Sequence, residues 1–292
     1  MDNSNQSASP FQLAICYWGL TRSTSFVHRS HHQHLFGPMR DGGIAYRTFM
    51  HTWSLPGDVQ RVWGKVQKQT VETDAWRLLA PHEFVRDNQS IFEEQMKRNW
   101  SLYWHRGARN WAPHLLQNHL CALESLQRAY AMATASSWAW THAVFVRPDV
   151  MLLNDLPLAE VRALKAGELA LVHSGSSLND QWAAGKRLAA AIYANRIADA
   201  AEMRSRIVAE ALLNFTVTRW RLSLRFVKFA FYRVRPDGST ACSQGFNQGL
   251  ALVCPMRVFI NAAANNGVAA KCNITSRHEH KIPSICSKMQ QH

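Results

Sequence analysis

The chain has 292 residues, of which 47% are hydrophobic and 10% aromatic, a composition that supports a large core and excludes an intrinsically disordered protein. Lys and Arg number 33 against 20 Asp and Glu, which gives a formal net charge of +13. This excess favours an anionic partner, such as a nucleotide, a nucleic acid, an anionic glycan or an acidic membrane surface, without selecting among them. No apolar run approaches the ~20 residues that a bilayer span needs.

The sequence leaves the cellular compartment open. Residues 1–10 lack the charged and apolar regions of a signal peptide and are predicted to form a disordered tail. Four N-glycosylation sequons, which begin at Asn88, Asn99, Asn214 and Asn273, point instead to a secretory route. No CxxC pair supports a zinc ribbon or a redox dithiol. Four cysteines near the C-terminus form either a disulfide-stapled tail or a set of unrelated thiols: Cys242, Cys254, Cys272 and Cys286.

The N-terminal part of the chain predicts a βαβ unit. An apolar run over residues 12–18, ended by Gly19, predicts a buried first strand. The polar segment over 21–36, closed by a Gly-Pro pair, is compatible with a helix, and residues 44–50 form a second plausible strand. Strand, helix and strand of these lengths are typical of a βαβ unit.

The rest of the chain continues this alternation. Leucines at helical spacing predict the clearest helix, over 113–133, and a short strand is expected within 78–85. One α/β domain over 11–255, with an irregular extension over 256–292, fits the whole pattern. The later predicted elements are strands over 141–146 and 168–172, a helix capped by Asn179 or Asp180 that runs to about residue 195, a helix over 204–220, and a strand over 226–234.

Arg147 and Asp149 flank a proline at the end of the predicted strand over 141–146. Open α/β sheets bind ligands outside the carboxyl ends of their strands. An arginine and a carboxylate at that place suit a phosphate-bearing ligand and a divalent ion. The alternative interpretation is a strand that ends in an ordinary Arg-Pro-Asp turn.

Gly19 offers a second ligand-binding feature, because it lies where the first strand turns toward a helix. A glycine there lets a ligand approach the backbone, the helix N-terminus attracts phosphate, and Arg22 adds positive charge. A purely structural turn is the alternative. Neither GxGxxG nor GxxxxGK[ST] nor GxSxG occurs, so the dinucleotide, P-loop and serine-hydrolase interpretations fail.

Two further patterns allow other functions. His28 and His32 are four residues apart, so one helical face would present two imidazoles to a metal ion; a histidine-rich surface helix is the alternative. Basic and aromatic residues interleave over 100–111 and 219–235, as they do in platforms for single-stranded nucleic acids. No recognised nucleic-acid motif accompanies them.

Several motifs occur in a fixed order along the chain. They are a first strand ending Gly-x-x-Arg, His-Thr-Trp at 51–53, Arg-Pro-Asp at 147–149, Asn-Asp-Gln-Trp at 179–182 followed by Gly185, a helical Glu210, and an Arg-x-Asp-Gly turn at 235–238. In their order and spacing, these features resemble a group of GT-A type glycosyltransferase-like proteins. The resemblance spans roughly residues 12–240, and no single motif in it is specific.

The resemblance implies a GT-A-like, Rossmann-type three-layer α/β domain with a mostly parallel sheet that binds a nucleotide sugar. Gly19 and Arg22 would border the nucleotide. Asp149 would replace the second acid of the DxD motif that holds Mn²⁺ or Mg²⁺ on the diphosphate. Arg147 stands where the first acid is expected, and because an arginine contacts a diphosphate directly, the need for metal would fall.

The same resemblance assigns the acceptor side of the site. Asp180 would act as general base or substrate anchor, with helix N-cap as its rival role, and Glu210 is a second catalytic candidate. Asn179 and Gln181 would bind sugar hydroxyls, because amides both donate and accept hydrogen bonds. The expected function is transfer of a sugar from a nucleotide donor to an unknown acceptor. The alternatives are a basic nucleic-acid-binding protein and a catalytically inactive glycosyltransferase-like fold.

Overall fold

The computed structural model describes residues 10–55, 59–62, 65–70, 74–103, 113–174, 177–236, 238, 240–241, 259–260 and 270–271. Most of the predicted N-terminal tail and of the C-terminal extension lies outside the described residues, as do the four C-terminal cysteines. Within the described part of the chain, no helix combines the length and apolarity needed to cross a bilayer.

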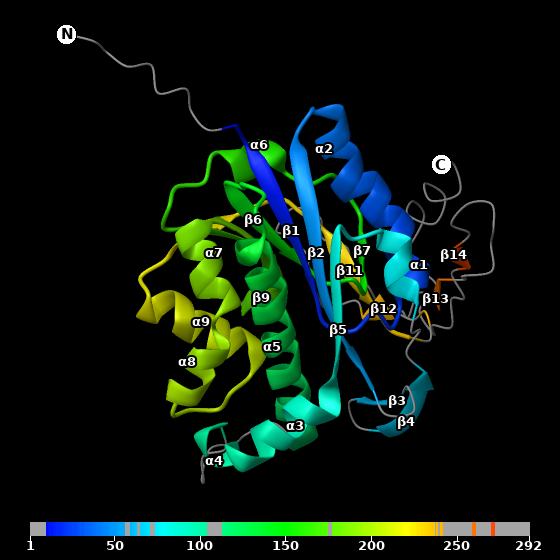
Figure 1. Cartoon of the computed structure of the whole chain (residues 1–292), viewed down its shortest axis with the longest axis vertical. Helices are drawn as coiled ribbons and strands as arrows, with labels where there is room; N and C mark the ends of the chain where they lie inside the picture. Colours follow the sequence, from blue (N-terminus) through cyan, green and yellow to red (C-terminus); the bar gives the residue numbers. More distant parts are fainter. Residues whose placement is uncertain are drawn as a thin grey trace, which may run out of the picture.

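A seven-stranded sheet forms the centre of the molecule (Figure 1). Its strand order is β10 (Ser223–Phe226), β8 (Glu168–Ser174), β9 (Ser177–Lys186), β6 (His142–Val146), β1 (Gln12–Trp18), β2 (Ala45–Ser54) and β5 (Glu83–Asn88). Neighbouring strands run parallel except at β9, which is antiparallel to both β6 and β8. The predicted α/β class with a mostly parallel central sheet is confirmed.

The sheet is buried on both faces, as continuous apolar strands require. In β1, Ile15 and Tyr17 face one hydrophobic cluster, while Cys16 and Trp18 face the other. Successive strand residues point to opposite faces, so β1 separates two cores that its own sequence supplies. This explains why residues 12–18 read as an unbroken apolar run.

Helices cover one face of the sheet (Figure 1). The long helix α5 crosses β1 and β2, and its leucines pack into the core at helical spacing. Its bounds confirm the clearest helix predicted from the sequence. The helices of this layer are α5 (Pro113–Ala135), α7 (Arg187–Ala194), α8 (Ile197–Glu202) and α9 (Ala209–Arg219), with α3 (Gln89–Arg98) and α4 (Trp100–Tyr103) at the lower end of α5 in Figure 1.

The opposite face carries a layer of short helices and a small sheet, which makes three layers. This layer contains α1 (Thr24–His31), η1 (His32–Phe36), α2 (Gly37–Asp41), η3 (Ala75–Leu79) and a sheet of β7 (Val150–Leu152), β11 (Phe231–Val234) and β12 (Thr240–Ala241). The remaining elements are α6 (Leu158–Arg162), the pair β3 (Val59–Val62) and β4 (Lys65–Thr70), and the pair β13 (Phe259–Ile260) and β14 (Ala270–Lys271).

Three predicted elements were wrong in detail. Asn179 and Asp180 do not cap a helix: both lie in β9, and α7 begins only at Arg187. The strand expected over 226–234 is two strands, because β10 pairs with β8 while β11 pairs with β7 in the second sheet. The Gly-Pro pair at 37–38 does not close a helix, because α1, η1 and α2 follow one another without a break and the pair lies in the first turn of α2.

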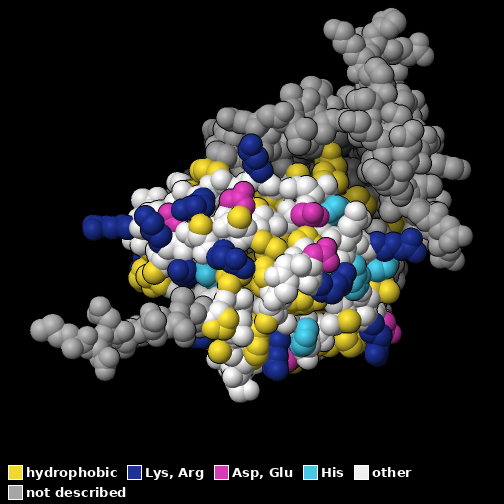
Figure 2. All heavy atoms as spheres, turned by 90° about the horizontal axis from the view of Figure 1, so that it is seen from above, with side chains coloured by type: hydrophobic (Ala, Val, Ile, Leu, Met, Phe, Trp, Pro, Cys, Tyr) yellow, Lys and Arg dark blue, Asp and Glu magenta, His cyan; other side chains and the backbone are white. Residues whose placement is uncertain are grey.

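Charged side chains are mixed on the face at which β1 begins. Figure 2 shows the molecule of Figure 1 from above, and on this face basic and acidic side chains are interspersed with hydrophobic ones. The excess positive charge of the chain therefore does not gather into one patch on this face.

Candidate functional site

The residues that the sequence singled out meet at the carboxyl edge of the parallel strands. The pairing of Tyr17 with Val146 and of Val146 with Trp182 fixes this edge. Gly19 and Arg147 follow directly after the carboxyl ends of β1 and β6. Because β9 runs the other way, its beginning, which holds Asn179, Asp180 and Gln181, lies at the same edge.

Asp149 lies at the centre of this edge, and its side chain has no exposed surface. Arg22 donates hydrogen bonds from Nε and Nη2 to Oδ2, at 3.0 and 2.8 Å. Arg147 donates from Nε to Oδ1 and from Nη2 to Oδ2, both at 2.7 Å, and Nε of Arg233 lies 3.6 Å from Oδ2. Burial raises the pKa of Asp149, but the charges of Arg147 and Arg22 outweigh it and hold the pKa below the ordinary range.

These surroundings do not suit a divalent ion on Asp149. Both carboxylate oxygens already accept hydrogen bonds from guanidinium groups. A cation there would face the repulsion of Arg22, Arg147 and Arg233. Among the described residues, no three His, Cys, Asp or Glu side chains group closely enough to hold a metal ion. The residues around Asp149 therefore do not form the metal site that the DxD motif would predict there.

A bulge in β9 presents Asn179, Asp180 and Gln181. The β8–β9 register shifts between Leu171 and His173, so that several β9 residues stand opposite a single β8 residue. Oδ1 of Asn179 accepts a hydrogen bond from the backbone N–H of Gln181 at 2.8 Å, which closes a local turn around Asp180. A bulge of this kind turns a side chain out of the ladder, and bulges are frequent beside active sites.

Asp180 is partly exposed and lies among other ionisable groups. The hydroxyl of Tyr193 donates a hydrogen bond to the backbone carbonyl of Asp180 at 2.7 Å. Burial lowers the pKa of His119 to about 4, against the opposing effect of the Asp180 charge. Burial and the same charge raise the pKa of Glu210 above its ordinary value. The two predicted catalytic residues, Asp180 and Glu210, are thus electrostatically coupled, and a carboxyl with a raised pKa suits proton transfer.

Trp18 joins two arginines at this edge. Cζ of Arg147 lies 5.1 Å from the centroid of its ring, and Cζ of Arg196 lies 5.9 Å from it. Arg196 is fully buried and also lies over the ring of Tyr193, at 4.0 Å. Cation–π contacts of this kind stabilise a guanidinium that is withdrawn from water.

Sequence reasoning missed His119, Tyr193 and Arg196. His119 had a usable signal, because it lies between Leu116 and Leu120 on the apolar stripe of α5, where a polar side chain needs a partner. Tyr193 and Arg196 had none, because their partners at the site, Asp180 and Trp18, come from other elements of the chain.

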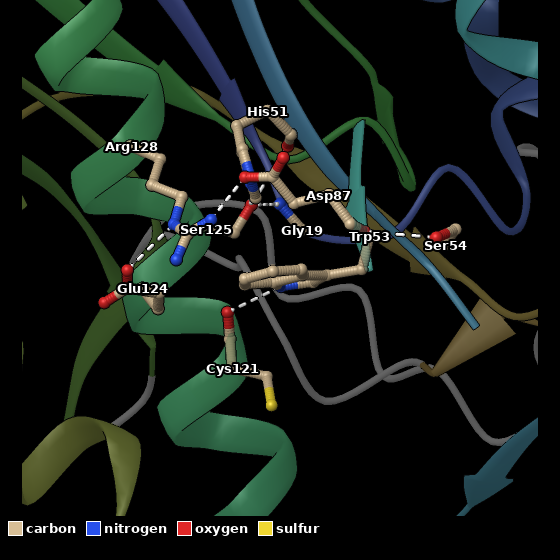
Figure 3. Close-up of polar contacts among 9 residues, drawn as sticks. All are labelled: Gly19, His51, Trp53, Ser54, Asp87, Cys121, Glu124, Ser125 and Arg128. Atoms are coloured by element: carbon tan, nitrogen blue, oxygen red, sulfur yellow. Dashed lines mark hydrogen bonds and ion pairs between the residues drawn. The ribbon is translucent and has the colours of Figure 1, made fainter. Parts of the chain in front are cut away.

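The His-Thr-Trp segment forms a polar network next to Gly19 (Figure 3). Oγ of Ser125 accepts a hydrogen bond from the N–H of Gly19 at 2.8 Å and lies 2.9 Å from Nδ1 of His51. Nε2 of His51 lies 3.2 Å from Oδ2 of Asp87, which also binds Arg128. The network holds the Gly19 turn, whose φ of +94° favours glycine.

This serine, histidine and aspartate set does not have the geometry of a hydrolase triad. Ser125 is fully buried on α5, and its hydroxyl also donates to the backbone carbonyl of His51 at 2.9 Å. A nucleophile must reach a substrate carbonyl, and this oxygen is enclosed by protein. The role of the network is to position the turn after β1.

The histidines of the first helical segment also have structural contacts. His31 is buried, with Nε2 at 2.7 Å from the carbonyl of Val150 and Nδ1 at 2.9 Å from the hydroxyl of Tyr17. Nε2 of His32 lies 2.8 Å from the carbonyl of Leu78. These contacts favour the structural interpretation of the cluster over the metal-binding one.

Comparison with known proteins finds only a distant structural similarity. No family model matches the chain, and no curated protein matches it. Among solved structures, the crystal structure of mouse xyloside xylosyltransferase 1 in its apo form is similar at 8% sequence identity and a TM-score of 0.38. The similarity covers 76% of this chain and 86% of that chain. This similarity is too distant to assign an activity.

Proposed function

We propose that this protein is a glycosyltransferase that transfers a sugar from a nucleotide-sugar donor to an acceptor, whose identity is open. One observation carries the proposal: residues from three separate motifs converge on one edge of the sheet. Gly19, the pair Arg147 and Asp149, and Asp180 lie there although the three motifs are far apart in sequence. This is the edge at which open α/β sheets bind their ligands.

The proposed roles follow from the chemistry of each side chain. Gly19 leaves room for the nucleotide, and Arg147 stabilises the charge that develops on the departing diphosphate. Asn179 and Gln181 orient sugar hydroxyls. Asp180 takes the proton of the acceptor hydroxyl or anchors the acceptor.

Glu210 is the second candidate for proton transfer. It lies in the first turn of α9, and both its burial and the Asp180 charge favour its protonated form by raising its pKa. A carboxyl group whose pKa is raised is suited to donate a proton in acid–base catalysis. Arg22 and Asp149 act behind Arg147, since their ion pairs hold its guanidinium in place.

Binding and turnover of donors test the proposal. Titration calorimetry with UDP, GDP and their sugar conjugates should show binding of at least one of them, and donor hydrolysis or transfer should follow in a screen of acceptors. Asp180→Asn should keep binding and lose turnover by about a hundredfold or more. Asp74→Asn is the matched control, because Asp74 is exposed and precedes the amino end of β5.

The outcomes separate the proposal from its alternatives. Absence of binding to every nucleoside diphosphate at millimolar concentration would contradict it. Binding without turnover in any acceptor screen would indicate the catalytically inactive fold. Tight, steeply salt-dependent binding of oligonucleotides in place of nucleotide sugars would indicate the nucleic-acid-binding protein.

A further inference from the structure

Three arginines contact the carboxylate of Asp149, and a fourth acts on two of them. Arg22, Arg147 and Arg233 contact it, and the charge of Arg235 acts on both Arg22 and Arg233. We call Arg22, Arg147, Arg233 and Arg235 the arginine cluster. In these ion pairs, three guanidinium groups share the one carboxylate of Asp149. The cluster therefore carries an excess of positive charge.

Part of this charge faces outward. Arg22 is buried, but Arg147 keeps 11% of its side chain exposed and Arg233 keeps 34%. The Nη1 atom of Arg147 makes no hydrogen bond to any described residue, and it lies beside the Gly19 turn, at 3.8 Å from the position of a Cβ on that glycine. Arg233 approaches Asp149 through Nε alone, at 3.6 Å. Donors on both side chains remain available to a ligand.

The crowding of these groups is unfavourable without a counter-charge. Burial lowers the pKa of Arg233, and the neighbouring charges of Arg22 and Arg147 lower it further. Like charges at such separation repel one another, and one carboxylate offsets only part of this repulsion. An anion placed between Arg147 and Arg233 would relieve it.

A fifth arginine, Arg196, also indicates that this end of the sheet is suited to an anion. Arg196 is fully buried, yet its Nε and Nη2 have no hydrogen-bond partner among the described residues. Buried charged donors without partners are costly. Arg196 shares the ring of Trp18 with Arg147, so its charge acts on the same end of the sheet.

We infer that the arginine cluster binds the diphosphate of the ligand directly and that this binding requires no divalent ion. Guanidinium groups match phosphate oxygens in bidentate geometry and stay charged at all relevant pH values. The neighbours of Asp149 leave its oxygens no place for a cation, while the outward donors of Arg147 and Arg233 suit an anion. This inference rests on the proposed function, because it concerns the same site.

Titration calorimetry in excess EDTA and in the presence of Mn²⁺ tests the inference, with UDP, GDP and inorganic pyrophosphate as probes. We expect the dissociation constant to agree within about twofold between the two conditions. Binding should also weaken as the salt concentration rises, because contacts between charged groups provide most of the affinity.

Substitutions locate the site. Arg233→Gln and Arg235→Gln should each weaken diphosphate binding. For Arg233→Gln the dissociation constant should rise about tenfold, because one charge-assisted contact is lost. Arg40→Gln is the matched control, since Arg40 is exposed on α2, just before β2 begins. Circular dichroism spectra should match the wild type for all three variants, because none of these side chains is fully buried.

The outcomes distinguish this inference from the proposed function. Binding that disappears in EDTA and returns with Mn²⁺ would overturn the metal-free site and leave a glycosyltransferase in place. Metal-free binding that neither Arg233→Gln nor Arg235→Gln alters would overturn the assignment to the arginine cluster. Absence of diphosphate binding in both conditions would instead remove the proposed function itself.

Discussion

At the scale of single residues, Asp149 balances the arginines around it and so contributes to folding as well as to the site. It is fully buried, and its partners Arg22 and Arg147 are nearly so. Removing one member of a buried ion pair leaves uncompensated charge in a medium of low polarity. The stability of the carboxyl edge therefore depends on this one carboxylate.

Asp149→Asn should lower the free energy of unfolding by about 3–5 kcal/mol at neutral pH. The pKa of Asp149 is lowered in the folded state, so its contribution is complete above the unfolded pKa of about 4 and declines as the pH falls below that value. Urea unfolding across pH should thus show a penalty that shrinks under acid conditions. Asp74→Asn, at an exposed ion pair, should cost less than about 1 kcal/mol; an equal cost for both variants would contradict the assignment.

Ser125 is the second residue with a testable structural role. Ser125→Ala would leave the N–H of Gly19 without its acceptor inside the core. The expected loss is about 1–3 kcal/mol of unfolding free energy, measured by urea denaturation. Ser137→Ala, at an exposed serine after the end of α5, is the control. A hydrolase role would instead predict labelling of Ser125 by a fluorophosphonate probe, and we expect none because the hydroxyl is enclosed.

At the scale of elements, Gly185 sets how closely α7 approaches β9. A Cβ on Gly185 would lie 3.1 Å from Cβ of Ala189 and 3.2 Å from the backbone N of Ala190. The helix start and the strand therefore pack backbone against backbone. This close packing gives a physical reason for a glycine at this position.

Gly185→Ala should destabilise the protein by about 1–3 kcal/mol, because the added methyl group overpacks the contact between β9 and α7. Thermal unfolding would measure the change. Gly167→Ala provides a matched control, since a Cβ there meets nothing within 4 Å. A Gly185→Ala variant as stable as the Gly167→Ala variant would show that α7 shifts freely on the sheet.

The elements also show which features the sequence predicts. β1 and α5 were predictable from their apolar patterns. β1 is buried on both faces and is therefore apolar throughout, whereas α5 buries one stripe and is apolar at helical spacing. The segment over 179–182 was not, because Asn and Asp favour helix caps locally while pairing with β6 and β8 decides the structure. The edge position of Arg147 and Asp149 follows from the strand pattern. The ion pair of Asp149 with Arg233 does not, because Arg233 lies on β11, which belongs to a second sheet.

At the scale of the whole molecule, buried histidines couple folding to pH. Burial lowers the pKa of four histidines to about 4, and they lie in different parts of the fold: His31, His51, His119 and His142. Each is held neutral when folded, whereas in the unfolded chain it takes up a proton below pH of about 6.5. The stabilisation from neutral histidines is therefore complete above pH 6.5 and is lost as the pH falls toward 4.

The unfolding free energy should accordingly fall by at least about 2 kcal/mol between pH 7 and pH 5, as measured by urea denaturation. His31→Phe should make this dependence shallower, because a side chain that takes up no proton replaces one that must be held neutral. Gln33→Ala, at an exposed position on the neighbouring η1 segment, should leave the slope unchanged. A stability that is flat over this interval would show that the core admits charged imidazoles, in conflict with their burial against Tyr17, Ser125 and the sheet.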